Sequence, residues 1–370
     1  MTMYLTSPIN KFTHIVHVAD IHIRLLKRHD EYRAVFEKFY QEIDKTPDTT
    51  LIAVLGDLFH NKTDLVPESI KLASEFLKTL ADKRPTLLIS GNHDATLNNK
   101  SRLDTLTSVV DPLQHPNLHY LKTSGLFFIG NLLFNNFSIF DDYTKYLHAS
   151  NVPKKLKNET DALIALYHGP VQGATTDVGY KVVSKTVSNE SFDGHDIVLL
   201  GDIHRYQQLQ EHSVNYNKPV ILYAGSMIQQ NHGESLDKHG FVLWDIAHRE
   251  YNHIELPNEY GFFTVEIEKG KLLTDISAMP KKVTLRAKCK ETIPSEVKAL
   301  MAKLSNKHEL VEITYDKISS GEEKKNIIDT TNINLISISS NIDYQNQLIK
   351  EFLLESKKEV MTEELLDQIF

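Results

Sequence analysis

The sequence predicts an α/β fold that is followed by a smaller α+β unit. Short apolar runs alternate with longer amphipathic runs over the first third of the chain, as in parallel strands joined by crossover helices. The 370 residues exceed the usual size of a single hydrophobic core. The pattern also changes near Pro257, where a separate strand-rich segment begins. We therefore expect at least two domains.

The first third is expected to contain a parallel sheet. Its apolar runs predict strands at residues 13–18, 50–55 and 85–90. Apolar residues at helical spacing predict helices at 30–43 and 67–81, and Pro67 is well placed to open the second helix. The order strand, helix, strand, helix, strand favours right-handed crossovers between parallel strands.

The next part of the chain is richer in strands. Few helical patterns separate its apolar runs, so we expect antiparallel pairing or a second layer of sheet. These runs lie at residues 126–130, 132–137, 162–168, 196–201, 220–225 and 240–246.

A compact α+β unit is expected after residue 258. Its predicted elements are strands at 262–270, 281–290 and 308–316 and a helix at 294–304. The polar segment 319–326 indicates a linker, and two helical segments with apolar faces follow at 342–355 and 362–370. The predicted domains are thus residues 1–258, 259–320 and 321–370.

Composition restricts the possible classes of protein. Cys289 is the single cysteine, so no internal disulfide can form, which fits a reducing compartment. Neither an apolar stretch of membrane-spanning length nor a signal peptide is recognisable, and we expect an intracellular protein with no membrane association. The net charge of −8 argues against unspecific coating of DNA by the whole surface, although a local basic site remains compatible with it.

Polar groups follow strand after strand at the point where each apolar run stops. They are Asp20 and His22, Asp57 and His60, Asn92 with His93 and Asp94, His168, and Asp202 with His204. The carboxyl ends of parallel strands meet at one edge of a sheet, where ligands bind. The spacing of two within Asp20–His22 and Asp202–His204 places both side chains on one face of an extended segment. A glycine before Asp57, Asn92 and Asp202 permits tight turns.

Each motif has a plainer explanation by itself. A single Gly-Asp after a strand is usually a turn or a helix cap, and an isolated Asp-x-His is usually a surface pair. The loop at Gly91–Asp94 could equally be a run of turn-forming residues. Five strand ends in succession that all carry Asp, Asn or His favour a metal site instead.

These blocks resemble the calcineurin-like metallophosphoesterase superfamily over roughly residues 13–246. The superfamily pattern is Asp-x-His, Gly-Asp, Gly-Asn-His-Asp/Glu, a lone His and Gly-His-x-His. The resemblance implies a two-layered β-sandwich flanked by helices, with two divalent metal ions. This chain departs from the pattern at Asp202, where the family usually has His. The additional oxygen ligand favours Mn²⁺, or Mg²⁺, over Zn²⁺.

The same resemblance implies a role for each residue of the site. Asp20, His22, Asp57 and His204 would hold one ion, and Asp57, Asn92, His168 and Asp202 the other. Asp57 would bridge the two ions, an arrangement suited to phosphate ester hydrolysis. His93 would face the phosphate and either stabilise the transition state or protonate the leaving oxygen. Asp94 would orient its neighbours or cap the next helix.

A narrower resemblance is to the SbcD family of nuclease subunits, which includes the meiotic-recombination-eleven-type nucleases. It rests on GDLFHNKTDLVPESI, on GDIHRYQ and on YAGSMIQQ at 223–230. By this resemblance His60 pairs with His93, although packing at a helix start is the plainer interpretation. The family implies double-strand exonuclease and single-strand endonuclease activity in DNA double-strand-break repair and recombination. It also implies a homodimer, with residues 67–81 and 101–111 as candidate surfaces.

The resemblance further implies that DNA and a coiled-coil ATPase of SbcC type are partners. The unit at 259–320 would be a DNA-binding cap, although its basic strand could simply be a solvated face. Candidate DNA contacts are Lys27, Arg28, Arg205, Lys282, Arg286 and Lys288. The tail residues Tyr344, Leu348 and Phe352 could dock in a groove of the ATPase or pack on their own domain. The chain has no phosphate-binding loop of ATPase type, so ATP hydrolysis would require another protein.

Two other functions remain open from the sequence. A phosphoesterase for small phosphates or phosphoproteins would have the same metal site but would not need a cap or tail helices. A catalytically weak adapter that binds DNA ends is favoured only by Asp202, and the other site residues argue against it.

Overall fold

A computed structural model describes residues 2–99, 102–184, 186–211, 213 and 217–318. Residues up to Ile318 form one compact unit. The linker and tail helices predicted within 319–370, including Tyr344, Leu348 and Phe352, lie outside the described residues. The domain boundaries at 258 and 320 remain predictions.

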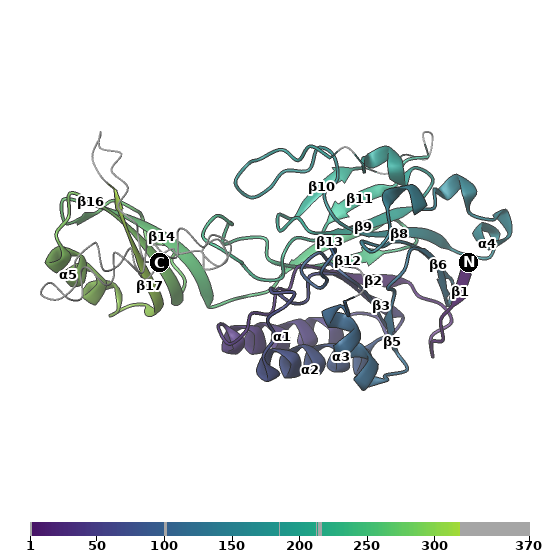
Figure 1. Cartoon of the computed structure of the whole chain (residues 1–370), viewed down its shortest axis with the longest axis horizontal. Coiled ribbons are helices and arrows are strands. Elements are labelled where there is room, and N and C mark those ends of the chain that lie inside the picture. The colour runs from purple at the N-terminus through teal and green to yellow at the C-terminus, as the bar shows by residue number, and fades with distance from the viewer. Residues whose placement is uncertain (1, 100–101, 185, 212, 214–216, 319–370) are drawn as a thin grey trace, which may run out of the picture. The chain divides into compact units, whose positions relative to one another are not determined.

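The strands in the described part of the chain form three sheets (Figure 1). The first has the order β1-β6-β7-β8-β9-β11-β10 and the second β13-β12-β2-β3-β4-β5. The strands of the first are β1 (Thr2–Tyr4), β6 (Gly125–Ile129), β7 (Leu132–Phe137), β8 (Ala162–His168), β9 (Ile197–Gly201), β10 (Gln207–Gln210) and β11 (Val220–Tyr223). The strands of the second are β2 (His14–Val18), β3 (Thr50–Leu55), β4 (Thr86–Ile89), β5 (Leu118–Tyr120), β12 (Gly240–Asp245) and β13 (Glu250–Glu255).

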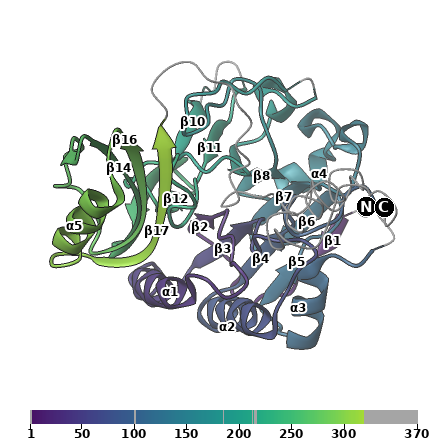
Figure 2. The ribbon, with the colours of Figure 1, turned by 60° about the vertical axis from the view of Figure 1, so that its left-hand side comes forward.

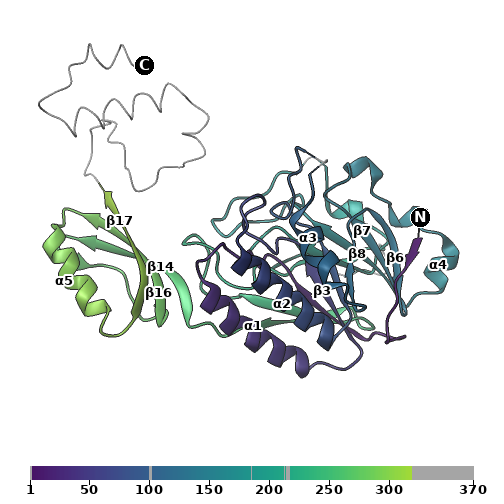
Figure 3. The same ribbon diagram turned by 60° about the horizontal axis from the view of Figure 1, so that its bottom comes forward.

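One hydrophobic core lies between the first two sheets, and another lies between the second sheet and its helices. Alternation along β3 sends Leu51, Ala53 and Leu55 into the core that the sheets share, while Ile52 and Val54 face the other way, toward helices. The helices on that outer face are α1 (His29–Asp44), α2 (Pro67–Lys83) and α3 (Thr105–Leu113) (Figure 3). The prediction of a two-layered sandwich flanked by helices is confirmed.

Pairing within the sheets is mixed, as the scarcity of later helices indicated. Strands β2, β3, β4 and β5 are parallel, whereas β6 pairs antiparallel with β7 and β12 pairs antiparallel with both β2 and β13. Short helical turns connect the later strands. They are η1 (Tyr143–Lys145), η2 (Ala149–Asn151), α4 (Lys154–Asn158) and η3 (Asn189–Phe192).

The third sheet has the order β15-β14-β16-β17 and carries one helix on one of its faces (Figure 2). Its elements are β14 (Tyr260–Glu268), β15 (Lys271–Leu272), β16 (Lys282–Lys290), α5 (Pro294–Leu304) and β17 (Glu309–Ile318). Val283 and Leu285 of β16 pack with Met301 and Leu304 of α5. The lysines and Arg286 of β16 alternate with these residues and therefore lie on the opposite face.

Within the described residues, the protein contains no helix with the length and apolar character that a membrane span requires.

Candidate metal centre

The polar groups predicted at the strand ends gather at one edge of the two stacked sheets. They are carried by the loops that follow β2, β3, β4 and β9 and by the last residue of β8. Among the described residues, three groups have ligand atoms within 4.8 Å of one another. They are His22, His60 and His93; Asp20, His22 and His204; and Asp20, Asp57 and His168.

The backbone at this edge turns with positive φ and is not extended. The prediction that Asp20–His22 and Asp202–His204 lie in extended segments is therefore wrong. Asp20 and His22 both have φ of 53°, Asp57 has 52° and Asp202 has 99°. Residues other than glycine adopt such angles at a cost and keep them where the surroundings enforce them. Here His22 N–H donates to the Asp57 carbonyl at 2.9 Å, which ties two of the loops together. The side chains therefore converge through tight turns.

The predicted need for glycine holds where loops approach each other. A Cβ on Gly91 would lie 2.1 Å from Asp57 Oδ1, and a Cβ on Gly201 would lie 2.2 Å from the Leu55 carbonyl oxygen. Both distances are far below van der Waals contact, and Gly56 also has a φ of +82°. A side chain at these positions would push the loops that carry the polar groups apart.

Asp57 lies between two sets of side chains. Its Oδ2 is 3.5 Å from His22 Nε2, and its Oδ1 is 3.4 Å from His168 Nε2. The two oxygens of one carboxylate thus face different imidazoles, as a bridging ligand requires. Oδ1 also accepts the backbone N–H of His93 at 2.8 Å, which fixes the carboxylate.

The first set surrounds Asp20, which is fully buried. Asp20 Oδ1 lies 3.9 Å from His22 Nε2 and 4.0 Å from His204 Nε2, and these two nitrogens are 2.9 Å apart. Tyr32 of α1 donates its hydroxyl to the His22 carbonyl and thereby fixes this loop.

The second set surrounds His168. Its Nε2 is 3.1 Å from Asn92 Oδ1 and 3.9 Å from Asp202 Oδ1. The backbone N–H of Asp202 reaches both oxygens of Asp20 at 3.1 Å, so the two sets share a boundary. The structure therefore brings together all seven residues predicted as metal ligands.

The partners of the imidazoles fix which nitrogen faces inward. His168 Nδ1 donates to the Leu55 carbonyl at 2.6 Å, and His204 Nδ1 donates to Glu234 Oε1 at 2.8 Å. Nε2 of each ring is therefore the nitrogen that faces the other polar groups of the centre, and once it loses its proton it offers a lone pair, which is the usual state of a metal-binding histidine.

Glu234 is a functional candidate that sequence reasoning missed. It is buried, and its carboxylate also accepts the Gln230 backbone N–H and the Asn231 side chain, each at 2.7 Å. It follows no apolar run, so nothing in the sequence pattern marked it.

The buried carboxylates of the centre would be stabilised by a bound cation. Burial raises the pKa of Asp20 to about 7. Burial also acts to raise the pKa of Asp57, but the nearby His168 and His22 outweigh it and lower that pKa. Burial opposes protonation of His204, yet the bond to Glu234 and the charge of Asp20 raise its pKa to about 9. Clustered buried carboxylates and inward-facing imidazoles fit divalent metal ions, which would replace these protons.

His60 and His93 lie beside the first set. Their rings are nearly parallel, with centroids 5.7 Å apart, and the His93 ring meets His22 edge-on at 4.9 Å. His93 Nδ1 donates to the His60 carbonyl at 2.6 Å, so the hydrogen bond between these residues runs through the backbone. The other ring nitrogen of His93, Nε2, takes no part in this hydrogen bond.

Asp94 is fully buried behind this pair. Its carboxylate accepts backbone N–H groups of Gly91 at 2.9 Å and Phe59 at 3.1 Å, and so joins the loops after β3 and β4. Asp104, and not Asp94, caps the following helix α3. The position of Asp94 suits an orienting residue.

Most of the predicted DNA contacts are ion-paired. Lys27 lies 3.0 Å from Glu312, Arg28 lies 2.6 Å from Glu31, and Lys282 lies 3.8 Å from Glu309. Arg286 lies 3.8 Å from Asp316. The side chain of Arg28 is only 10% exposed, so Arg28 has a mainly structural role. Lys288 is half-buried on the same face of β16 as Lys282 and Arg286. Arg205 is exposed and lines a cavity of about 430 Å³ next to His204.

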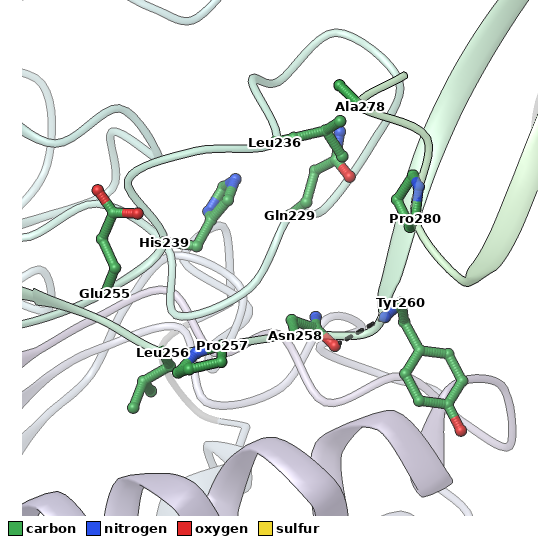
Figure 4. A pocket seen from close by; sticks show the side chains of 10 residues that line it. All are labelled: Gln229, Leu236, His239, Glu255, Leu256, Pro257, Asn258, Tyr260, Ala278 and Pro280. Atoms are coloured by element: carbon green, nitrogen blue, oxygen red, sulfur yellow. Dashed lines mark hydrogen bonds between the residues drawn. The ribbon is translucent and has the colours of Figure 1, made fainter. Parts of the chain in front are cut away.

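Gln229 connects the Glu234 loop to the third sheet. Its side chain accepts the Phe262 N–H at 2.7 Å and donates to the carbonyls of Glu234 and Phe262 at 3.0 and 3.2 Å. Figure 4 shows Gln229 in a cavity of about 310 Å³, with Pro280 and Tyr260 of the third-sheet region on its other side. Hydrogen bonds of the Gln229 side chain thus connect the candidate centre to the third sheet.

A family model, the calcineurin-like phosphoesterases, matches residues 13–206. The chain belongs to this family. The match ends just after His204, so it spans every strand end that carries a predicted ligand. A calcineurin-like phosphoesterase is a hydrolase that uses divalent metals, which agrees with the donor set described above.

Two relatives are similar in sequence to more than half of this chain. It is 39% identical over 307 residues to an uncharacterized protein, R555, of Acanthamoeba polyphaga mimivirus, covering 81% of this chain. The chain spans about a fifth of that relative, 22% of its length. It is 26% identical over 262 residues to an SbcCD nuclease subunit of Staphylococcus epidermidis, covering 64% of this chain and 67% of that protein.

Among solved structures, a cold-active protein-tyrosine phosphatase of a Shewanella species covers 68% of this chain and 81% of its own. Its sequence identity is 10% and its TM-score 0.28, a likeness too remote to bear on function.

Proposed function

We propose that the chain is a metal-dependent phosphodiesterase that cleaves DNA, working as a homodimer with an SbcC-type ATPase in double-strand-break repair. The observation that carries the hydrolytic part is Asp57, whose two oxygens face His22 on one side and His168 on the other. The relationship to the SbcCD nuclease of S. epidermidis supports DNA as the substrate. The DNA, the dimer and the ATPase partner belong to this proposal.

The residues that would hold two divalent cations, Mn²⁺ or Mg²⁺, form the two sets around Asp57. Asp20, His22, Asp57 and His204 would hold one, and Asp57, Asn92, His168 and Asp202 the other. Bound cations supply positive charge to the phosphate oxygens and lower the pKa of the attacking water. Oxygen atoms from Asp202 and Asn92 make the second set harder than an all-imidazole set, which favours Mn²⁺ or Mg²⁺.

The protein itself contributes proton transfer and rigidity. His93 is anchored through Nδ1 to the His60 carbonyl, and its Nε2 can hold a proton for the leaving oxygen of the ester. Asp94 holds the loops of both histidines through backbone N–H groups. Such anchoring keeps the reacting groups in place without reorganisation during the reaction.

One observation favours a second candidate, a phosphoesterase for small phosphates or phosphoproteins. Lys27, Arg28, Lys282 and Arg286 each have an acidic partner, so few of the predicted DNA contacts are available to phosphates without breaking an ion pair.

The first test is degradation of linear double-stranded DNA by the purified chain in Mn²⁺, in Mg²⁺ and in EDTA. We expect cutting in Mn²⁺ that stops in EDTA and in Asp57→Ala, which also controls for contaminating nucleases. Hydrolysis of a nitrophenyl phosphodiester without cutting of DNA, even after addition of the ATPase partner, would favour the small-substrate enzyme. DNA-end binding without hydrolysis of either substrate would indicate an adapter.

A further inference from the structure

Arg24 is a charged residue next to the centre that the proposed mechanism does not use. It follows His22 by two positions, and its side chain is partly buried. Its Nη1 lies 3.1 Å from Nε2 of His60, and its Nη2 donates to the Gln230 carbonyl at 2.9 Å. The second bond holds the guanidinium in place against the segment that also binds Glu234 through the Gln230 N–H.

The contact between Arg24 and His60 determines where the imidazole proton lies. A guanidinium has five N–H donors and no acceptor. Nε2 of His60 must therefore accept from Arg24, and a proton on Nε2 would place two donors against each other. The neutral ring carries one proton, which must then be on Nδ1.

The proton on Nδ1 of His60 has no acceptor among the described residues. This nitrogen is buried and makes no hydrogen bond to any described residue. The His60 ring lies 5.5 Å from the His22 ring and 5.7 Å from the His93 ring, and those two rings are 4.9 Å apart, so the three imidazoles form a triangle. A buried donor without an acceptor destabilises a protein, and a ligand that supplies the acceptor would explain it.

We propose that Arg24 is a positioning residue that fixes the Nδ1–H tautomer of His60, so that the ring offers an N–H to an oxygen of the substrate phosphate. The identity of the acceptor rests on the proposed function, whereas the tautomer does not. The two parts can therefore be tested separately.

The tautomer can be read by NMR of protein labelled with ¹⁵N-histidine, with His60→Asn used to assign the His60 signals. We expect His60 of the wild type to carry its proton on Nδ1. Arg24→Leu should shift the proton toward Nε2, whereas Arg24→Gln, whose amide can still donate, should retain the Nδ1–H form. Arg33→Leu, an exposed arginine of α1, is the matched control and should change nothing. A wild-type proton on Nε2, or no response to Arg24→Leu, would overturn the assignment.

The acceptor is tested with inorganic phosphate added to the Mg²⁺-loaded protein. We expect the His60 Nδ1 signal to shift in the wild type and in Arg24→Gln, and to shift much less in Arg24→Leu. Absence of a shift in the wild type would overturn the phosphate contact. With a nitrophenyl phosphodiester, Arg24→Leu should lower kcat about tenfold, the usual cost of one charge-assisted hydrogen bond, and Arg24→Gln should restore most of it. A wild type that hydrolyses no phosphodiester would instead count against the proposed function, while the NMR result would still decide the tautomer.

Discussion

At the residue scale, His204 depends on one carboxylate, that of Glu234. The bond of 2.8 Å between His204 Nδ1 and Glu234 Oε1 fixes the ring and makes its Nε2 a stronger base. Glu234→Gln keeps an acceptor but removes the charge, so we expect Mn²⁺ affinity to fall about 10- to 100-fold by titration calorimetry. Glu159→Gln, an exposed residue paired with Lys155, is the control. Unchanged affinity in Glu234→Gln would show that His204 is oriented without help from this charge.

Residue roles were predictable where a residue ends a strand, and much less so elsewhere. Asp20, Asp57 and Asp202 were recognisable because each stops an apolar run, and the structure gathers them. Glu234 and Arg24 were not recognisable, because they act on histidines 30 and 36 residues away in the chain and neither lies in a pattern. The left-handed turns were also missed, since spacing alone does not distinguish an extended pair from a turn.

At the element scale, His195 connects the segment just before β9 to strand β7 by hydrogen bonds. Its Nδ1 donates to the Phe192 carbonyl at 2.8 Å, and its Nε2 accepts from Asn135 of β7 at 3.0 Å. Burial lowers the pKa of His195 from 6.5 to about 4. Between pH 4 and pH 6.5, His195 is therefore neutral in the folded protein and protonated in the unfolded chain. The contribution of His195 to stability is therefore complete above pH 6.5 and is lost as the pH drops to 4, by about 3 kcal/mol.

The measurement is urea unfolding between pH 7 and pH 4. His195→Gln should be less stable at pH 7, because it loses one or both bonds, and it should lose less stability on acidification than the wild type. Exposed His248→Gln should not reduce the loss on acidification, because the bond to Asp245 raises rather than lowers the pKa of His248. Parallel pH curves for His195→Gln and the wild type would mean that another group causes the acid sensitivity.

Long elements were predictable because periodicity accumulates over many residues. The predicted strand 50–55 and helix 294–304 coincide with β3 and α5. The strands β1 and β5 have three residues each and were missed, because three residues carry no usable period. β13 was missed for another reason, since Glu250–Glu255 is half-exposed and becomes a strand only by pairing with β12.

At the scale of the whole molecule, charge decides how DNA could be bound. The net charge is −8, and acidic partners occupy most of the cations predicted to contact DNA. Lys27 and Glu312 join the loop after β2 to β17, with side chains that are 73% and 44% exposed. An exposed ion pair of this kind contributes little to stability, so its carboxylate can be changed without unfolding the protein.

Glu312→Gln should therefore free Lys27 for a phosphate and strengthen DNA binding. Lys27 would gain a phosphate contact without first losing Glu312, and each added contact releases about one counterion. We expect DNA affinity to rise severalfold at low salt and the dependence of log K on log salt to steepen by about one, measured by fluorescence anisotropy. Glu42→Gln, which frees Lys45 just after the end of α1, is the matched control for a general change in charge. Equal gains in both variants would reflect net charge alone, and no gain in Glu312→Gln would place Lys27 away from the DNA and favour a small phosphate ester as substrate.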